Sequence, residues 1–499
     1  RDNVGSDVGR GNDIERSTIR ASGGLRWKAS ESNVTAEASY TWGRTDITNT
    51  LRNRRLNDRY FTGIDAVALT ADDLNGTNVN RAFAAGGIGR FNAVRNGESI
   101  VITPGTAQVG DIVCRSELTG LPAPSNNSNV GAPPRFASGT VINGTNVSGR
   151  TRPVTFRQGD GTCAPINLFG PQAIQGAGLD WAFADLEQKT VIEQQQILGV
   201  LSGDTGHFFE LPGGPIGFAT GFEWRRDSSQ FTRDAFETIE GRVIENTPAA
   251  LFDSPVTPQA ITVREVFGEI RVPVLGDMPF IDKLEVTASG RYSDYNTIGT
   301  TETYSFGGIY APTDWLSFRG TFSRAIRAPN IGELFAPQTI ATLGVNADPC
   351  DDGNITLGSS NREQNCLEFV APGFNSADFL TAFTPGTTGG NPDLIEETSD
   401  SFTIGGVFQP KGILGGALDN LVVIVDYYDI EITNAVGSLT GAAIAAACVD
   451  LPSTDNQFCD AIVRDPNLGG AIVDFTSGNI NLAVLRARGI DFEARYSFD

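Results

Sequence analysis

Six cysteines are the residues of this chain with the clearest capacity for covalent chemistry. They are Cys114, Cys163, Cys350, Cys366, Cys448 and Cys459, and they form three well-separated pairs along the sequence. Sequential pairing is the most local of the possible connectivities, and disulfides indicate an oxidising compartment. Buried free thiols are the alternative. Zinc ligation is disfavoured because the spacing does not fit a zinc site and because His207 is the single histidine.

Motifs that would indicate catalysis or a bound ion do not occur. The sequence has no H-E-x-x-H, no Gly-Lys pair of a phosphate-binding loop and no G-x-S-x-G turn. The acidic stretch DPCDDGNITLGS fails as a calcium loop, because Cys350 and Ser359 stand at the third and twelfth positions, where ligands are required. We therefore predict no catalytic residue, no metal site and no cofactor, and a protein that is not an enzyme.

Charge and hydropathy exclude two further classes. The chain has 37 Lys and Arg residues against 59 Asp and Glu residues, a formal net charge of -22, whereas a nucleic-acid surface needs basic stripes. No apolar run is long enough for a membrane-spanning helix. The opening stretch RDNVGSDVGRGNDIERS lacks the apolar segment of a secretory signal, so the chain is expected to begin within a longer protein.

The strongest pattern along the chain is period-2 alternation, which is typical of β-strands with one apolar and one polar face. In KLEVTASGRYSD, Leu284, Val286 and Tyr292 fall on one face and Glu285 and Arg291 on the other. Similar or less regular alternation predicts about eleven strands. They lie near residues 19–27, 34–42, 191–203, 216–224, 262–272, 284–292, 304–310, 316–322, 402–408, 421–430 and 490–498.

The connections between these strands alternate in length. Short connections follow the first, third, fifth, seventh and ninth strands, a modest one spans residues 294–303, and long ones span residues 43–190, 226–261, 325–399 and 431–487. Aromatic residues near strand ends and this asymmetry are typical of transmembrane barrels, in which about 9 to 11 residues cross the membrane. We predict an all-β fold, an antiparallel transmembrane β-barrel with long loops on one side. A secreted adhesin-like β protein is the alternative.

Two blocks at the ends of a long connection carry a more specific signal. In FSRAIRAPNIGELFAP, Pro329 should end strand pairing and Asn330 should cap a short helix. The second block is NPDLIEETSDSFTIGGVFQP. Together these stretches resemble the barrel domain of TonB-dependent receptors of Gram-negative outer membranes. The residues that carry the resemblance are Arg327, Ala328, Pro329, Asn391, Pro392, Asp393 and Leu394.

This resemblance implies a barrel of about 22 strands filled by an N-terminal plug. Residues 1–499 are then expected to be a partial barrel domain that lacks the plug and several C-terminal strands, with all six cysteines in extracellular loops. The implied partners are outer-membrane lipid, the TonB energy-transducing complex and a small-molecule nutrient, with no nucleic acid. The implied nutrient is a siderophore, a corrinoid or an oligosaccharide. A passive porin and a secreted adhesin remain the alternatives.

Charged residues on the polar faces of the strands are candidates for the lumen of this barrel. The set comprises Glu37, Glu223, Arg225, Glu285, Arg291, Arg319, Arg324, Glu493 and Arg495. They could line a ligand path, or they could pair with the absent plug, as charged lumen walls generally do. Haem is disfavoured because residues 330–390 contain no histidine and His207 falls in a predicted periplasmic turn.

Overall fold

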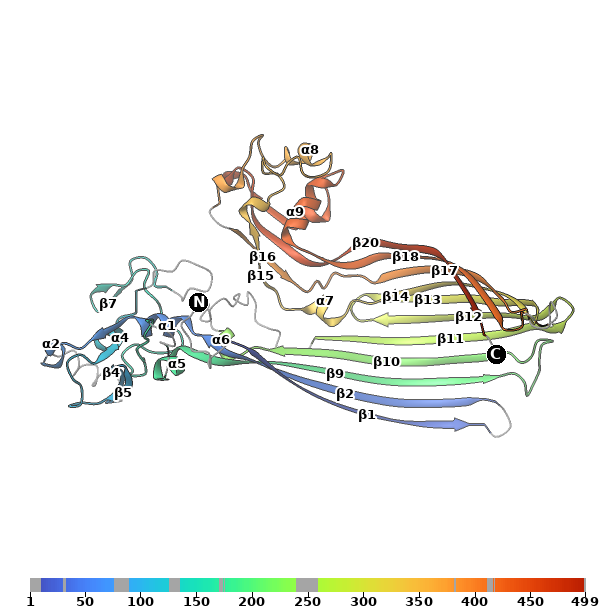
Figure 1. Cartoon of the computed structure of the whole chain (residues 1–499), viewed down its shortest axis with the longest axis horizontal. Helices are drawn as coiled ribbons and strands as arrows, with labels where there is room; N and C mark the ends of the chain where they lie inside the picture. Colours follow the sequence, from blue (N-terminus) through green and yellow to red (C-terminus); the bar gives the residue numbers. More distant parts are fainter. Residues whose placement is uncertain are drawn as a thin grey trace. The chain divides into compact units, whose positions relative to one another are not determined.

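Eleven long strands follow one another in a single sheet and confirm the predicted strand number among the described residues (Figure 1). The computed structural model describes residues 10–29, 33–75, 89–124, 135–169, 174, 176–238, 259–380, 383–410, 416 and 418–497. The strands are β1 (Asn12–Lys28), β2 (Thr35–Arg55), β9 (Phe183–Asp204), β10 (Gly217–Thr232), β11 (Gln259–Met278), β12 (Ile281–Tyr295), β13 (Gly299–Thr313), β14 (Leu316–Arg327), β17 (Glu397–Phe408), β18 (Leu421–Leu439) and β20 (Ala471–Tyr496).

The strands are longer than expected. They range from 12 residues in β14 to 26 residues in β20, more than the predicted length of about 9 to 11 residues for a membrane crossing. The additional residues extend into the predicted long connections, where the alternation of apolar and polar residues fades. The predicted modest connection after the sixth strand is in fact a tight turn, since β12 ends at Tyr295 and β13 begins at Gly299.

The two faces of the sheet differ in a way opposite to that of a water-soluble protein. Phe222, Val266, Phe306, Phe322 and Phe402 lie opposite one another through the strand registers and are 42–54% exposed. We call the side that they share the apolar face. The other side, the polar face, carries carboxylates that are less than 9% exposed. Exposed aromatic and aliphatic side chains that recur on one face of neighbouring strands indicate a surface that water does not contact.

Contacts divide the chain into two compact units. The first unit comprises residues 1–17, 46–191 and 230–256. Between β2 and β9 it contains short elements, and α6 follows β10: α1 (Asn57–Ile64), β3 (Ala66–Ala68), α2 (Ala71–Asn75), β4 (Phe91–Arg95), β5 (Glu98–Ile102), β6 (Ile112–Cys114), α4 (Arg115–Thr119), β7 (Val141–Ile142), β8 (Thr145–Asn146), α5 (Gly176–Ala182) and α6 (Ala235–Thr238). The described residues of the predicted long connection at residues 43–190 thus include short helices and strands.

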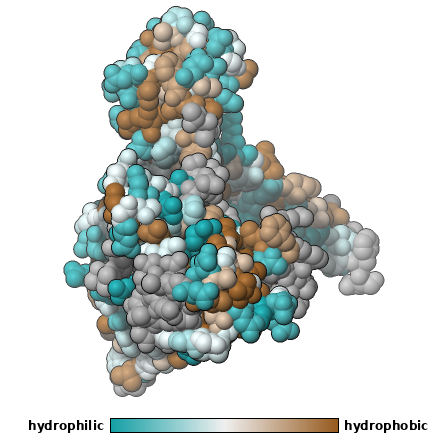
Figure 2. Space-filling model, turned by 90° about the vertical axis from the view of Figure 1, so that its left-hand side faces the viewer, coloured by the Kyte–Doolittle hydropathy of each residue, from teal (hydrophilic) through white to brown (hydrophobic). Residues whose placement is uncertain are grey.

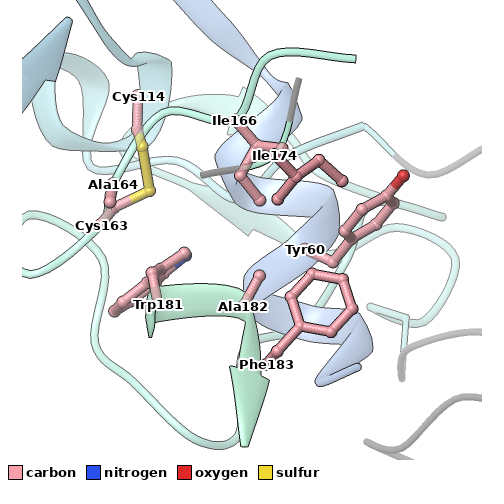
Figure 3. Close-up of a cluster of buried hydrophobic side chains, with 9 residues drawn as sticks. All are labelled: Tyr60, Cys114, Cys163, Ala164, Ile166, Ile174, Trp181, Ala182 and Phe183. Atoms are coloured by element: carbon pink, nitrogen blue, oxygen red, sulfur yellow. A yellow bond between two sulfur atoms is a disulfide. The ribbon is translucent and has the colours of Figure 1, made fainter. Parts of the chain in front are cut away.

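The core of the first unit surrounds a disulfide. Cys114 and Cys163 are bonded and fully buried beside Tyr60, Trp181 and Phe183 (Figure 3). Phe183 packs edge-on against Tyr60, with ring centroids 6.4 Å apart. This packing joins the first residue of β9 to α1.

The second unit comprises residues 18–45, 192–229 and 257–499, which include most of the sheet. Its two longest connections contain the remaining elements: α7 (Ile331–Phe335), β15 (Thr339–Gly344), η2 (Val345–Ala347), α8 (Arg362–Cys366), η3 (Ser376–Asp378), β16 (Phe383–Gly389), α9 (Gly441–Asp450), α10 (Gln457–Asp460), β19 (Ile462–Asp465) and η5 (Pro466–Leu468). The predicted short helix over IGELF is confirmed as α7. Within the described chain, no helix combines the length and hydropathy that a membrane crossing requires.

The elements after α7, together with the first residues of β20, form one folded body, which we call the loop module (residues 339–389 and 440–478). Figure 1 shows α8 and α9 close together in it, although they come from different connections. Its core includes Val370, Phe374, Ile444, Val449 and Phe458. In the upper part of Figure 2, the module's surface has hydrophobic and hydrophilic residues side by side.

Candidate functional site

The first family block lies where β14 ends at the rim of the sheet. Arg327 makes two hydrogen bonds of 2.7 Å to the carboxylate of Glu397, the first residue of β17, and contacts Glu333 at 3.0 Å. Glu333 closes a capping box with Asn330 at the start of α7. After Ala328, Pro329 removes a strand donor and the cap starts the helix, so this block turns the end of the strand into a fixed corner.

The second family block fastens the same corner from the other side. The backbone N–H of Asn391 donates to the carbonyl of Glu333 at 2.8 Å, and its side-chain amide donates to Asn479 at 2.9 Å. Pro392 and Asp393 follow in a turn, and Leu394 is buried in one cluster with Leu334. The two blocks are therefore brought together by the fold, and their contacts describe a structural joint between β14, α7 and β17.

Replacing Arg327 by Lys is expected to weaken this joint by about 1 kcal/mol, because an ammonium group cannot make the paired hydrogen bonds of a guanidinium. The side chain is 44% exposed, and solvent screening keeps the effect modest. The temperature at which the protein loses its compact mobility on unboiled SDS gels would measure the loss. R327A should lose more than R327K, and equal values for wild type and R327A would show that the joint contributes nothing.

Seven of the nine lumen candidates lie on the polar face. Arg319 makes a bidentate pair with Asp426, Arg291 contacts Glu265 at 2.7 Å and Arg271 contacts Glu285 at 3.0 Å. The candidates that share this face through the strand registers are Glu223, Arg225, Glu285, Arg291, Arg319, Glu493 and Arg495.

The prediction that Arg324 lies on the polar face is wrong, because the strand registers place it on the apolar face. It lies opposite Asp400 in the register and bonds to it at 2.8 Å, and its guanidinium lies 5.7 Å from the ring centroid of Tyr304. It shares the apolar face with Phe322, two residues away. The pairing of β14 with β17 has no bulge, so residues five positions apart, such as Arg319 and Arg324, must point to opposite faces.

The polar face has a cavity of about 540 Å³ above a charged network. Glu265 is 4% exposed and accepts hydrogen bonds from Arg291 at 2.7 Å and Ser293 at 2.8 Å. Glu223, opposite it in the register, accepts from Arg225 at 3.2 Å. Facing glutamates would repel each other, and the arginines offset that repulsion. The wall therefore presents guanidinium and hydroxyl groups that can bind polar atoms without leaving a bare charge.

The loop module is joined by contacts that span the two long connections. Arg464 makes a bidentate pair of 2.8 Å with Asp348, and Arg362 makes one with Asp450 at 2.6 and 2.7 Å. β16 also pairs in parallel with β20. Sequence reasoning missed this docking. The residues were visible in the sequence, but no spacing rule relates charges that lie 116 positions apart.

Two disulfides cross-link the loop module. Cys350 is bonded to Cys366 and Cys448 to Cys459, so the sequential pairing is confirmed for all three bridges. In the acidic stretch DPCDDGNITLGS, Asp348 binds Arg464, and the carboxylate of Asp351 accepts a hydrogen bond of 2.7 Å from the backbone N–H of Ser376. Burial raises the pKa of Asp351 above its usual value. These carboxylates are used in folding the loop.

Glu117 of the first unit should make that unit's stability depend on pH. It is 2% exposed and accepts from the N–H groups of Gly161 at 2.9 Å and Cys163 at 3.1 Å. Burial raises its pKa to about 7, against the opposing effect of these hydrogen bonds. Because the folded pKa lies above the ordinary value of 4.5, the folded state binds the proton more tightly. Stability is then greatest at low pH and is lost as pH rises through 7.

The expected size of this effect is up to about 3 kcal/mol between pH 4.5 and pH 8. Hydrogen exchange of the amides around Cys163, corrected for intrinsic rates, should show stronger protection at pH 5 than at pH 8. Glu117→Gln does not titrate, so it should flatten this dependence whatever its stability at one pH. An unchanged pH dependence in E117Q would assign the effect to another group.

An antiparallel sheet with an exposed apolar face, a charged polar face and folded long loops defines the class of outer-membrane barrel proteins. The sequence matches the family described as TonB dependent receptor-like, beta-barrel over residues 2–499. The chain belongs to this family, whose members are transport receptors and not enzymes and are found in the outer membrane of Gram-negative bacteria.

Solved structures with a similar arrangement are distant in sequence. The siderophore receptor PirA from Acinetobacter baumannii is 11% identical with a TM-score of 0.45, over 98% of this chain and 43% of that chain. A ferric enterobactin receptor (PfeA) mutant from Pseudomonas aeruginosa is 12% identical with a TM-score of 0.42, over 96% of this chain and 41% of that chain. The RagAB peptide importer is 10% identical with a TM-score of 0.39, over 98% of this chain and 35% of that chain. The chain thus spans less than half of each. No curated protein matches it in sequence.

Proposed function

We propose that this chain is the barrel part of an outer-membrane receptor that binds a scarce nutrient outside the cell and imports it into the periplasm with energy from the TonB complex. The family match over residues 2–499 carries the proposal. A siderophore, a corrinoid or an oligosaccharide is the nutrient class we propose. In this arrangement the apolar face contacts lipid, the polar face lines the import path, and the loop module lies outside the cell.

The loop module and the polar face suit different steps of import. Ion pairs and disulfides hold the loop module as one body, so it can present a fixed surface to a ligand without a large ordering cost. The polar face offers Arg225 and Arg291 beside Ser293 and Tyr295 around its cavity. Such a wall can exchange hydrogen bonds with a moving ligand or with a plug. The geometry therefore supports capture by the loops, followed by passage along a charged wall.

Uptake in the native host tests the proposal. The gene would be deleted, restored on a plasmid, and restored again in a strain without TonB. Uptake of labelled ferric siderophores, cobalamin, oligosaccharides and peptides would then be compared. We expect that deletion of the gene abolishes uptake of one of these compounds, and that the plasmid restores this uptake only when TonB is present. Rescue without TonB, together with diffusion of small sugars through the protein in liposomes, would instead establish a passive pore.

The orientation makes a separate prediction. After mild reduction of intact cells, a membrane-impermeant thiol reagent should modify Cys459, which is only partly buried in the loop module. A cysteine introduced at His207, in the short turn between β9 and β10, should react only after lysis. The reverse pattern would show that the long connections face the periplasm.

A further inference from the structure

A pair of arginines borders the apolar face on β10 and β11. Along β10, the apolar face presents Phe222, then Trp224 and then Arg226. On the antiparallel strand β11, Val266 lies opposite Phe222, and the next residue on this face toward the same end of the sheet is Arg264. On these two neighbouring strands, the change from apolar to cationic side chains occurs within two residues of the same height. Both arginines lie near the long connection that joins the end of β10 to the start of β11.

The strand register places the two arginines together. Trp224 lies directly opposite Arg264, and Arg226 lies opposite Thr262, two residues further along β11. Arg226 and Arg264 are therefore diagonal neighbours on one face, close enough for long side chains to reach a common ligand. We call them, together with Trp224, the arginine patch.

Neither arginine has an ion-pair or hydrogen-bond partner in the described part of the chain, and both are exposed. Asp294 lies opposite Arg264 in the register of β11 and β12 but forms no ion pair with it. Elsewhere on the same face, Arg324 is held by Asp400 and Arg486 by Asp429. Two adjacent guanidinium groups that form no ion pair within the described chain repel each other, so this position is suited to an anion from outside the chain.

A cavity of about 310 Å³ lies beside the patch. It is lined by Glu193, Gln195, Trp224, Arg226 and Ser228. The carboxylate of Glu193 is bound by Arg44 at 3.1 Å, which reduces its repulsion of an anion. The amide, the hydroxyl and the indole are the groups that proteins offer to sugar hydroxyls and sugar rings, whereas a plain phosphate would need none of them.

We infer that the arginine patch and this cavity bind the phosphorylated sugar headgroup of a lipid in the outer leaflet. The phosphate would meet Arg226 and Arg264, the sugar would occupy the cavity beside Trp224, and the acyl chains would follow Phe222 and Val266. A lipid is favoured over a free sugar phosphate because the apolar face begins directly below the arginines. The inference rests on the proposed contact of the apolar face with lipid and is independent of the nutrient.

Native mass spectrometry of the full-length receptor, purified in detergent and titrated with lipid A, tests the inference. Wild type should retain lipid A in preference to phosphatidylcholine. R226A/R264A should bind lipid A at least about ten-fold more weakly, because charge-assisted hydrogen bonds to phosphate are lost. W224A should also weaken binding, and dephosphorylated lipid A should bind wild type and the double variant alike.

The matched control is R324A, which removes an arginine from the same face that already has a carboxylate partner. It should bind lipid A as wild type does. Equal losses in R324A and R226A/R264A would show general charge attraction and overturn the site. Competition by glucosamine phosphate as strong as by lipid A would show that the patch binds a soluble sugar phosphate and not a lipid. Nutrient uptake does not enter these measurements, so a failed uptake assay would leave this result unaffected.

Discussion

Replacing Arg464 by Ala should release the loop module into a protease-sensitive state while the long strands stay folded. The side chain of Arg464 is 9% exposed and that of Asp348 is 3% exposed, and the pair joins β19 to the residue that follows η2 in the other connection. Removing one partner leaves a buried, uncompensated carboxylate, at a cost of about 3–5 kcal/mol. Limited proteolysis of the receptor in detergent, followed by mapping of the cleavage sites, would measure the effect.

Arg362 provides the matched control for this prediction. It makes the same bidentate contact with Asp450 in the same module, but Asp450 is 28% exposed and can be hydrated when the arginine is removed. Binding to Arg362 lowers the pKa of Asp450, so that carboxylate remains charged without difficulty at neutral pH. R362A should therefore be cleaved more slowly than R464A. Equal cleavage would mean that burial of the acid is not the cause.

Phe475→Ala should destabilise the same module by about 3–5 kcal/mol, the usual cost of emptying a large aromatic site. Phe475 is 1% exposed and packs with Leu343, Ala445 and Ile472. Its ring also fills the space beside two glycines, since a Cβ at Gly441 would lie 2.4 Å from it and one at Gly386 would lie 2.5 Å from it. Hydrogen exchange across β15, α9 and β20 would report the loss.

A second variant separates the cavity from a general effect of losing a hydrophobic residue. Leu357 lies in the same module but is 75% exposed, so L357A should leave exchange unchanged. In addition, Gly441→Ala should be destabilising in wild type and much less so in F475A, because the ring that the new methyl group would strike is absent there. Additive effects of G441A and F475A would contradict the close packing of these two residues.

Much of the sheet could be predicted because its information is local. Alternation places apolar side chains on one face of a strand whatever its neighbours are, and Pro329 with Asn330 ends a strand and starts a helix within four residues. The disulfides followed the same logic, since each bridge joins cysteines that are neighbours among the six. The strand count, α7 and the three bridges were therefore predictable from short stretches of sequence.

The remainder depended on information that no short stretch holds. The docking of Arg464 on Asp348 and the parallel pairing of β16 with β20 are set by where β14 and β20 bring the two connections. Arg324 differs from these cases, because its charge is typical of the polar face whereas its position in the strand is not. Strict alternation from Phe322 places it on the apolar face, where Asp400 on the next strand satisfies its charge.

The cross-links of the loop module form two sets with different requirements for assembly. Each disulfide closes a ring inside one connection, with separations of 16 and 11 residues, so it needs nothing from the rest of the chain. The ion pairs to Arg464 and Arg362 need both connections to be in place. The disulfides can therefore form while the chain is still unfolded, whereas the two ion pairs can form only after the strands have paired.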